Sequence, residues 1–359
     1  MKEQVKIRVG TGIKDSFSSF RKTPAFTGFV LFLGALLLNI ALQGPASFFS
    51  PQSLSVLFSS NIPFLLIVIA QGILLLSGTM DISIGIQLAL VNVVTIMTVQ
   101  EWGVPFAIGG LIGIVAAMVA SSVIWALISV VRLPDLLVGF ALTYAIRGVN
   151  VMIMNIPQGS VSRELFRAYN SLILGFIPAS TIAIVIVLLI WSYFKRTAFG
   201  RHIYAVGANP QNAYAAGISP VKVQFLAFMI KGLFTGIAGI CLTLMTASGD
   251  PLQAEAWGLR SLAAAIIGGF TFGGWGSVAC AVFGASFLVL IQNSVYFFFN
   301  LLSRLIPDLW VTSYWHNFIA DIIIFLGLLT TIITVRGQRE TLRINLENKY
   351  MKRGEANAK

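Results

Sequence analysis

Four side chains that can form ionic or hydrogen bonds lie within or beside apolar segments of the sequence: Asp81, Ser83, Lys231 and Arg260. An ionised group inside a bilayer costs about 2.5–3.5 kcal/mol or more unless it is paired or hydrated, so such groups mark ion pairs, cavities or transport paths. Their types and spacing match no nucleophile–base pair and no metal-ligand motif. We therefore expect these residues to contact a solute or to pair with one another, and not to catalyse a reaction.

The composition indicates that these residues sit in a membrane domain. The chain of 359 residues is 57% hydrophobic and only 10% charged, whereas a soluble domain carries about 25% charged residues. Apolar runs of about 20 residues, long enough to cross a hydrocarbon core of about 30 Å, recur along most of the sequence. We predict an all-α polytopic membrane protein of about ten helices. The predicted spans are residues 26–42, 56–77, a third ending near 99, 104–131, 134–154, 172–194, 223–246, 257–270, 278–299 and 318–335.

The basic residues predict the orientation of these spans. The net charge is +11, and six Lys or Arg lie in residues 1–24 and seven in residues 336–359. Because positive charge gathers in cytosolic segments, we predict a basic cytosolic tail at each end, 1–24 and 336–359, around a transmembrane domain at 25–335. The basic segments lack interleaved aromatic residues, so we expect no nucleic-acid partner. Cys241 and Cys280 lie in spans, which argues against a disulfide or redox site.

The segment 195–222, between the sixth and seventh spans, is polar, basic and punctuated by Gly200, Gly207, Pro210 and Gly217. This punctuation predicts short helices in a compact knob. Pro210 suits a first helical position, and Asn209 suits the cap before it. A cytosolic knob of this kind can receive force from a separate ATPase; the alternative interpretation is an ordinary ordered loop.

Two other stretches, residues 78–85 and 268–276, are dense in glycine between apolar segments. Irregular backbone at membrane depth is tolerated only where it is buried in protein or lines a water-filled path. Broken helices of this kind occur at the solute sites of transporters. We expect both stretches to lie inside the protein.

Three stretches together resemble the ribose-type permeases of bacterial ABC importers, over roughly residues 50–335. They are Thr197–Pro210 continued by Ala216–Ile218, then Gly78–Gly85, and then Leu262–Gly269 followed by Gly273–Gly276. The first is similar to the family's cytoplasmic coupling segment. On this resemblance, nine residues are expected to couple the chain to an ATPase: Gly200, Arg201, Tyr204, Ala205, Gly207, Asn209, Pro210, Ala216 and Gly217.

The resemblance implies a transport subunit of the bacterial cytoplasmic (inner) membrane, working by alternating access with both termini cytosolic. The chain has no Gly-x-x-x-x-Gly-Lys-[Ser/Thr] loop for ATP phosphates, so no cofactor is expected on it, and ATP with Mg²⁺ would bind a partner. The implied partners are ABC ATPase subunits, an identical or paralogous permease subunit, an extracytoplasmic solute-binding protein and membrane lipid. The solute would be a monosaccharide such as ribose, with a nucleoside, a sugar-derived signal or an anionic sugar as alternatives.

Two other classes stay open. An ion-coupled secondary carrier would transport without any partner, and a membrane scaffold or lipid-modifying enzyme would not transport at all. The enzyme class is disfavoured because the sequence lacks an acid–base or metal constellation.

Lys231 and Arg260 depart from the family pattern, which has a small or hydroxyl residue at the first position and an acidic residue at the second. Lys231 lies about eight residues, or roughly 12 Å, beyond the cytosolic end of its helix. Three interpretations of Lys231 remain open: an ion pair with Asp81 or Asp321, a contact with a second permease subunit, or a basic path for a polar or anionic solute. Asp81 could line that path or cap the following helix.

Aromatic residues crowd the sequence between Tyr296 and Trp315. We interpret them as a belt at one membrane interface, in preference to a platform that stacks on sugars.

Overall fold

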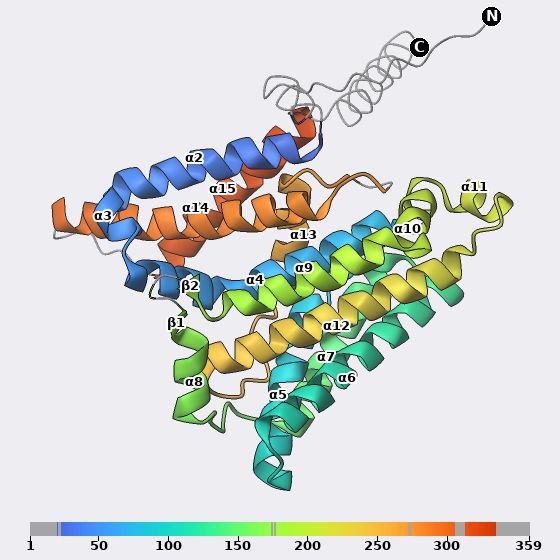
Figure 1. Cartoon of the computed structure of the whole chain (residues 1–359), viewed down its shortest axis with the longest axis horizontal. Helices are drawn as coiled ribbons and strands as arrows, with labels where there is room; N and C mark the ends of the chain where they lie inside the picture. The colour runs from blue at the N-terminus through green and yellow to red at the C-terminus, as the bar shows by residue number, and fades with distance from the viewer. Residues whose placement is uncertain are drawn as a thin grey trace, which may run out of the picture.

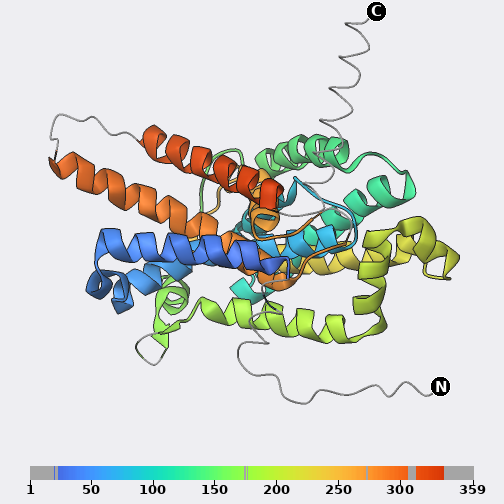
Figure 2. The ribbon, with the colours of Figure 1, turned by 90° about the horizontal axis from the view of Figure 1, so that it is seen from above.

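The computed structural model describes residues 20, 23–173, 175, 177–271, 274–305 and 313–334. The predicted C-terminal tail 336–359 lies outside the described residues, as does all of the N-terminal tail 1–24 except Phe20, Thr23 and Pro24. The described chain is built of helices with a single two-stranded hairpin, so the all-α prediction is confirmed. Figures 1 and 2 show long helices running side by side.

The longer helices are α2 (Ala25–Gln43), α4 (Pro51–Leu76), α5 (Ile84–Trp102), α6 (Phe106–Trp125) with the π-helical turn η1 (Ala126–Val130), α7 (Asp135–Ile153), α9 (Thr181–Arg196), α12 (Pro220–Thr246), α14 (Val278–Leu305) and α15 (Ser313–Thr334). The shorter elements are α3 (Pro45–Phe48), α8 (Arg163–Asn170), β1 (Leu172–Ile173), β2 (Ile177–Pro178), α10 (Ala198–Ala208), α11 (Pro210–Ala215) and α13 (Trp257–Ile267). Within the described residues, seven helices are long and apolar enough to cross a membrane, so the total of about ten stays a prediction.

Helices α4, α5, α12 and α14 are the most buried of the long helices, and fewer residues are buried in α6 and α7, which pack on α5, and in α2, which packs on α14. Small residues permit the close packing. A Cβ on Gly232 or Gly236 of α12 would lie 2.9 or 2.8 Å from the backbone of α6, and a Cβ on Gly113 of α6 would meet Thr95 of α5 at 2.7 Å. Backbone approach of this kind is the usual role of glycine pairs in membrane helices.

The sixth predicted span, residues 172–194, begins too early. Its first residues form the antiparallel strands β1 and β2, in which Leu172 pairs with Pro178. Pro178 has no N–H for a helical hydrogen bond, and the helix α9 begins only at Thr181, whose hydroxyl donates to the Pro178 carbonyl at 2.7 Å. The second span errs in the opposite direction: α4 begins at Pro51, five residues before the predicted start.

The connection between the fifth and sixth predicted spans contains the short helix α8. Ser162 caps this helix by accepting from the Leu165 N–H. The Tyr169 hydroxyl then donates to the Ser59 carbonyl of α4 at 2.9 Å, and burial raises the pKa of this phenol. The loop is thus anchored to the central helices by a hydrogen bond between residues far apart in sequence.

The eighth predicted span is shorter than a crossing. Helix α13 has 11 residues, which is about 16 Å at 1.5 Å per residue, or half of a hydrocarbon core. The irregular segment 247–256 precedes it, and within this segment Gly249 and Pro251 are buried whereas Leu252 and Ala256 are exposed. Ala247 and Ala254 near its two ends have φ of +56° and +63°, a strained conformation for residues other than glycine.

Within the segment 195–222, the predicted breaks at Gly200 and Gly207 are wrong, because α10 runs through both glycines. The chain turns instead at Thr197, where α9 and α10 meet at 81°. Pro210 begins α11 as predicted, and the Asn209 side chain caps it by accepting from the Asn212 N–H at 2.9 Å. The result is the compact knob that the sequence predicts (Figure 1).

Candidate functional site

The segment 195–222 contacts both glycine-dense breaks backbone to backbone. A Cβ on Gly207 of α10 would overlap the Leu76 carbonyl oxygen, and would lie 2.8 Å from the Cα of Gly274. A Cβ on Gly78 would meet the Cα of Gly207 at 3.4 Å. We call the meeting of Gly78, Gly207 and Gly274 the glycine junction. Sequence reasoning singled out each stretch but not their contact.

The backbone conformation at this junction requires glycine as well. Gly78 and Gly274 have φ of +79° and +78°, which an L side chain rarely adopts. Because no side chain separates these three backbone segments, α10 packs directly against the C-terminal end of α4 and the segment before α14. Rigid contacts of this kind carry motion between elements better than flexible side chains do.

The nine predicted coupling residues divide by exposure. Gly200 and Gly207 are buried, and Tyr204 and Ala205 are half-buried on the side that faces the helices. Burial raises the pKa of the Tyr204 phenol. The exposed members are Arg201, Asn209, Pro210, Ala216 and Gly217.

Tyr214 in α11 is a candidate interface residue that the sequence analysis did not single out. It is 72% exposed and lies close in sequence to Pro210 and Ala216. Its sequence signal is an aromatic residue within a polar segment, which is a feature of protein–protein interfaces. Exposed tyrosines are enriched at protein interfaces.

Lys231 lies in a fully buried charge cluster formed by Asp81, Ser83, Gln87, Ser121 and Lys231. Its Nζ atom donates to Asp81 Oδ2 and to Gln87 Oε1, both at 2.6 Å, and to Ser121 Oγ at 3.3 Å. Neither the Lys231 nor the Asp81 side chain has exposed surface. All three ammonium protons therefore have an acceptor, which is the arrangement that a buried lysine requires.

The Asp81 carboxylate also organises the break before α5. Its Oδ1 atom accepts from the Ser83 N–H at 2.8 Å and from the Ser83 hydroxyl at 2.6 Å, and its Oδ2 atom accepts from Gln87 Nε2 at 2.9 Å. On the same stretch, Asp135 Oδ2 accepts from the Met80 N–H at 3.0 Å. The geometry matches the ion-pair interpretation of Lys231, with Asp81 and not Asp321 as partner.

Arg260 lies outside this cluster. It donates to Asp321 of α15 at 3.2 Å, and the two side chains are 27% and 53% exposed. A second pair joins Arg147 of α7 to Glu255, in the segment before α13, at 3.3 Å, and these side chains are 42% and 28% exposed. We call the surface that carries both pairs the ion-pair face; α7 and α15 lie along one edge of the molecule in Figure 2. Exposed charge within membrane helices requires water or a protein neighbour.

The irregular segment 247–256 connects the ion-pair face with the interior. Asn92 of α5 donates to the Ser248 carbonyl at 3.0 Å and accepts from the Asp250 N–H at 2.8 Å. Asn150 of α7 donates to the Pro251 carbonyl at 3.2 Å. These two buried amides, which sequence reasoning missed, satisfy backbone that has no helical partners.

The segment ends against the break that holds Asp81. A Cβ on Gly258 would overlap the carbonyl oxygen of Ile82, and a Cβ on Gly85 would lie 2.6 Å from the Gly258 N atom. The start of α13 is therefore in backbone contact with the start of α5. The glycine junction, the charge cluster and the ion-pair face form one connected system.

Known proteins with related sequences cover most of the chain. The autoinducer 2 import system permease protein of Photorhabdus luminescens is 25% identical over 289 residues, which is 79% of this chain and 82% of that protein. The fructose import permease protein of Rhizobium meliloti is 25% identical over 71% of this chain and 73% of its own length. The D-allose transport system permease protein of Escherichia coli K12 is 25% identical over 70% and 78%. No solved structure matches.

A family model described as "Branched-chain amino acid transport system / permease component" matches residues 53–328, which include the glycine junction, the charge cluster and both pairs of the ion-pair face. That match extends over well more than half of the sequence. The chain belongs to this family of transport permeases.

Proposed function

We propose that this chain is the membrane-spanning permease half of an ATP-driven importer, and that it moves a monosaccharide or a similar small polar solute by alternating access. The chemistry of ATP hydrolysis, with Mg²⁺, belongs to a partner subunit. The observation that carries the proposal is the glycine junction, because it joins a knob outside the helix bundle to two breaks within it.

The coupling segment supplies the mechanical step. An ATPase subunit would bind the exposed side of the knob, around Pro210 and Tyr214. The opposite side of α10, with Ile203 and Val206, is buried against the bundle. Closure of the ATPases on ATP would push α10, and Gly207 would carry that displacement to the Leu76 carbonyl and to Gly274.

The ion-pair face is the proposed contact with a second permease subunit, identical or paralogous, and the proposed wall of the solute path. In lipid, the exposed Arg260–Asp321 and Arg147–Glu255 pairs would each carry the cost of a charge in hydrocarbon. Opposite a second subunit, the same pairs would border a polar passage. Paired charges of both signs suit an uncharged polar solute, which agrees with the fructose and allose named for two relatives.

The positions of the basic residues support one orientation of the chain in the membrane. Lys195 and Arg196 lie in the last turn of α9, Arg201 in α10 and Lys222 in the first turn of α12, all within the segment 195–222, and Arg132 lies in the loop between η1 and α7. The positive-inside rule therefore supports a cytosolic knob, and with it cytosolic termini in the bacterial inner membrane. A solute-binding protein would deliver the solute at the opposite end.

Co-purification from the native membrane tests this proposal. An ATPase subunit should co-elute with the full chain, and deletion of Ala205–Gly217 should abolish that association while the chain still inserts. Retention of the ATPase by the deleted chain would refute the coupling role.

Uptake assays test the solute and the energy source. Vesicles containing the assembled system and its binding protein should accumulate a monosaccharide only with internal ATP. Uptake driven by a proton or sodium gradient in vesicles that hold this chain alone would support the ion-coupled carrier instead.

A further inference from the structure

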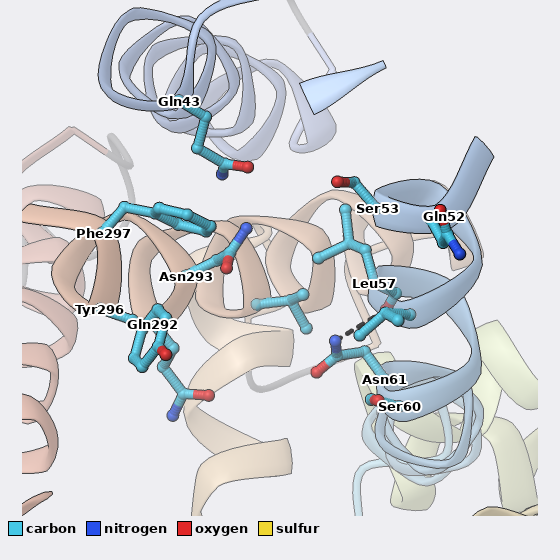
Figure 3. Close-up of a pocket in the computed structure, with 12 residues that line it drawn as sticks. Gln43, Gln52, Ser53, Leu57, Ser60, Asn61, Gln292, Asn293, Tyr296 and Phe297 are labelled. Atoms are coloured by element: carbon cyan, nitrogen blue, oxygen red, sulfur yellow. Dashed lines mark hydrogen bonds between the residues drawn. The ribbon is translucent and has the colours of Figure 1, made fainter. Parts of the chain in front are cut away.

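A cavity of about 510 Å³ opens at the end of the bundle opposite the knob. It lies between the last turn of α2, the first turns of α4 and the second half of α14, so none of the helices of the ion-pair face lines it (Figure 3). Its volume is within the range of small-molecule sites. The lining residues are Gln43, Gln52, Ser53, Val56, Leu57, Ser60, Asn61, Val289, Gln292, Asn293, Tyr296 and Phe297.

The chemistry of the lining is unusual for a membrane domain because it is rich in carboxamides and carries no charged side chain. Five of the twelve residues are Asn or Gln, and two are Ser. Each carboxamide offers both donors and acceptors, and it is costly in an apolar environment unless its hydrogen bonds are made. A helix end needs no such concentration of amides for stability.

Buried contacts fix part of this wall. Asn39 of α2 is fully buried, and its Nδ2 atom donates to Ser294 Oγ at 2.6 Å and to the Leu290 carbonyl at 2.7 Å. Its Oδ1 atom accepts from Gln43 Nε2 at 3.0 Å and from Asn293 Nδ2 at 3.1 Å. The amide nitrogens of Gln43 and Asn293 are thereby held in place, which leaves their carbonyl oxygens as acceptors at the cavity.

Other amides of the wall keep hydrogen-bonding capacity. Asn61 Nδ2 donates to the Leu57 carbonyl of its own helix at 2.7 Å, and its oxygen carries no hydrogen bond from the described residues. Among the residues that the structure describes, the Gln52 and Gln292 side chains have no hydrogen-bond partner. Figure 3 shows the Tyr296 ring beside Gln292 and the Phe297 ring beside Asn293, across the cavity from Asn61 and Gln52.

We propose that this cavity, the amide pocket, is a binding site for an uncharged polyhydroxylated molecule of monosaccharide size. Sugar hydroxyls both donate and accept, as carboxamides do, and the C–H face of a sugar ring can stack on Tyr296 or Phe297. The absence of Lys and Arg from the lining disfavours phosphate or carboxylate ligands. This assignment replaces the interfacial-belt interpretation for these two aromatic residues. The site is distinct from the ion-pair face, so it does not depend on the proposed solute path.

Ligand-observed NMR on the full chain in lipid nanodiscs tests the proposal, with D-ribose, D-fructose and ribose 5-phosphate as probes. Sugar-headed detergents must be avoided in purification because they present the same chemistry. The neutral sugars should show saturable binding and the phosphate none. Octyl glucoside in a parallel arm distinguishes a lipid-borne polyol from a free one, and saturable binding of either supports the site.

Two substitutions, Asn61→Leu and Gln292→Leu, should each weaken binding about tenfold if each removes one or two hydrogen bonds. Gln100→Leu is the matched control, because Gln100 is an exposed amide on α5 that does not line the pocket. Equal affinity in all three variants, or no saturable binding of any neutral polyol, overturns the proposal. Binding by a chain that fails to transport would count against the proposed function alone, and transport without binding against the amide pocket alone.

Discussion

The substitution Lys231→Met tests the buried charge cluster most sharply. It removes the ammonium group and leaves the Asp81 carboxylate buried, with hydrogen bonds from Ser83 and Gln87 but without its ionic partner at 2.6 Å. Removing one member of a buried pair costs about 3–5 kcal/mol, because the remaining charge is uncompensated. Folded domains are stable by about 5–15 kcal/mol, so the loss would be a large share of the whole.

The double variant Lys231→Met with Asp81→Asn should recover most of this loss. An amide keeps an oxygen that can accept from the Ser83 N–H, and no charge remains buried. Replacing both members of a buried pair with neutral groups is often close to neutral in stability. The coupling between the two positions should therefore be large and favourable, about 2 kcal/mol or more.

Reversible unfolding in mixed micelles measures the free energy of unfolding of four proteins: the wild type, Lys231→Met, Asp81→Asn and the double variant. Lys222→Met is the control, because Lys222 is exposed in the first turn of α12, and substitutions at exposed positions usually change stability by no more than about 0.5 kcal/mol. Additive losses in the double variant would refute the ion-pair account. So would a Lys231→Met chain that unfolds like the wild type but transports a different solute, which is the result that a basic solute path predicts.

Three further substitutions address other parts of the structure. Tyr214→Ala should weaken ATPase association in a pull-down assay without lowering thermal stability, and unchanged association would exclude Tyr214 from the interface. Asn92→Leu should destabilise the chain by about 2 kcal/mol or more in the same unfolding assay, since two backbone groups of segment 247–256 lose their partner; stability within about 0.5 kcal/mol of wild type, the range usual for surface substitutions, would contradict that role. Asp321→Asn should leave folding intact but reduce the cross-linking yield between two permease subunits, and an unchanged yield would place the subunit contact elsewhere.

Local sequence signals predicted the parts of the fold that depend on neighbouring residues. Asn209 and Pro210 specify the start of α11 because a cap and a first-turn proline act within one turn. Gly232 and Gly236 are one helical turn apart, a local spacing that favours the close packing of α12 on α6 seen in the structure. The ion pair of Lys231 with Asp81 was one of three open interpretations, since charge alone requires a partner but does not identify it.

Contacts between distant segments could not be predicted from one sequence. Gln87 and Ser121 complete the charge cluster from two other helices, and nothing in the pattern around either residue distinguishes it from a helix-packing polar group. The segment 247–256 accepts hydrogen bonds from Asn92 and Asn150, which lie more than 90 residues away from it. Hydropathy finds apolar helices, and it does not find irregular backbone that other helices satisfy.

The most direct test of the account is the ratio of solute transported to ATP hydrolysed when Gly207 is replaced. Gly207→Ala places a methyl group against the Leu76 carbonyl and the Gly274 backbone, whereas Gly34→Ala, the control, adds its methyl group in open space. We predict that the Gly207→Ala assembly still binds and hydrolyses ATP but transports several times less solute per ATP than the control. A transport ratio equal to that of the control would contradict the claim that force passes through the glycine junction.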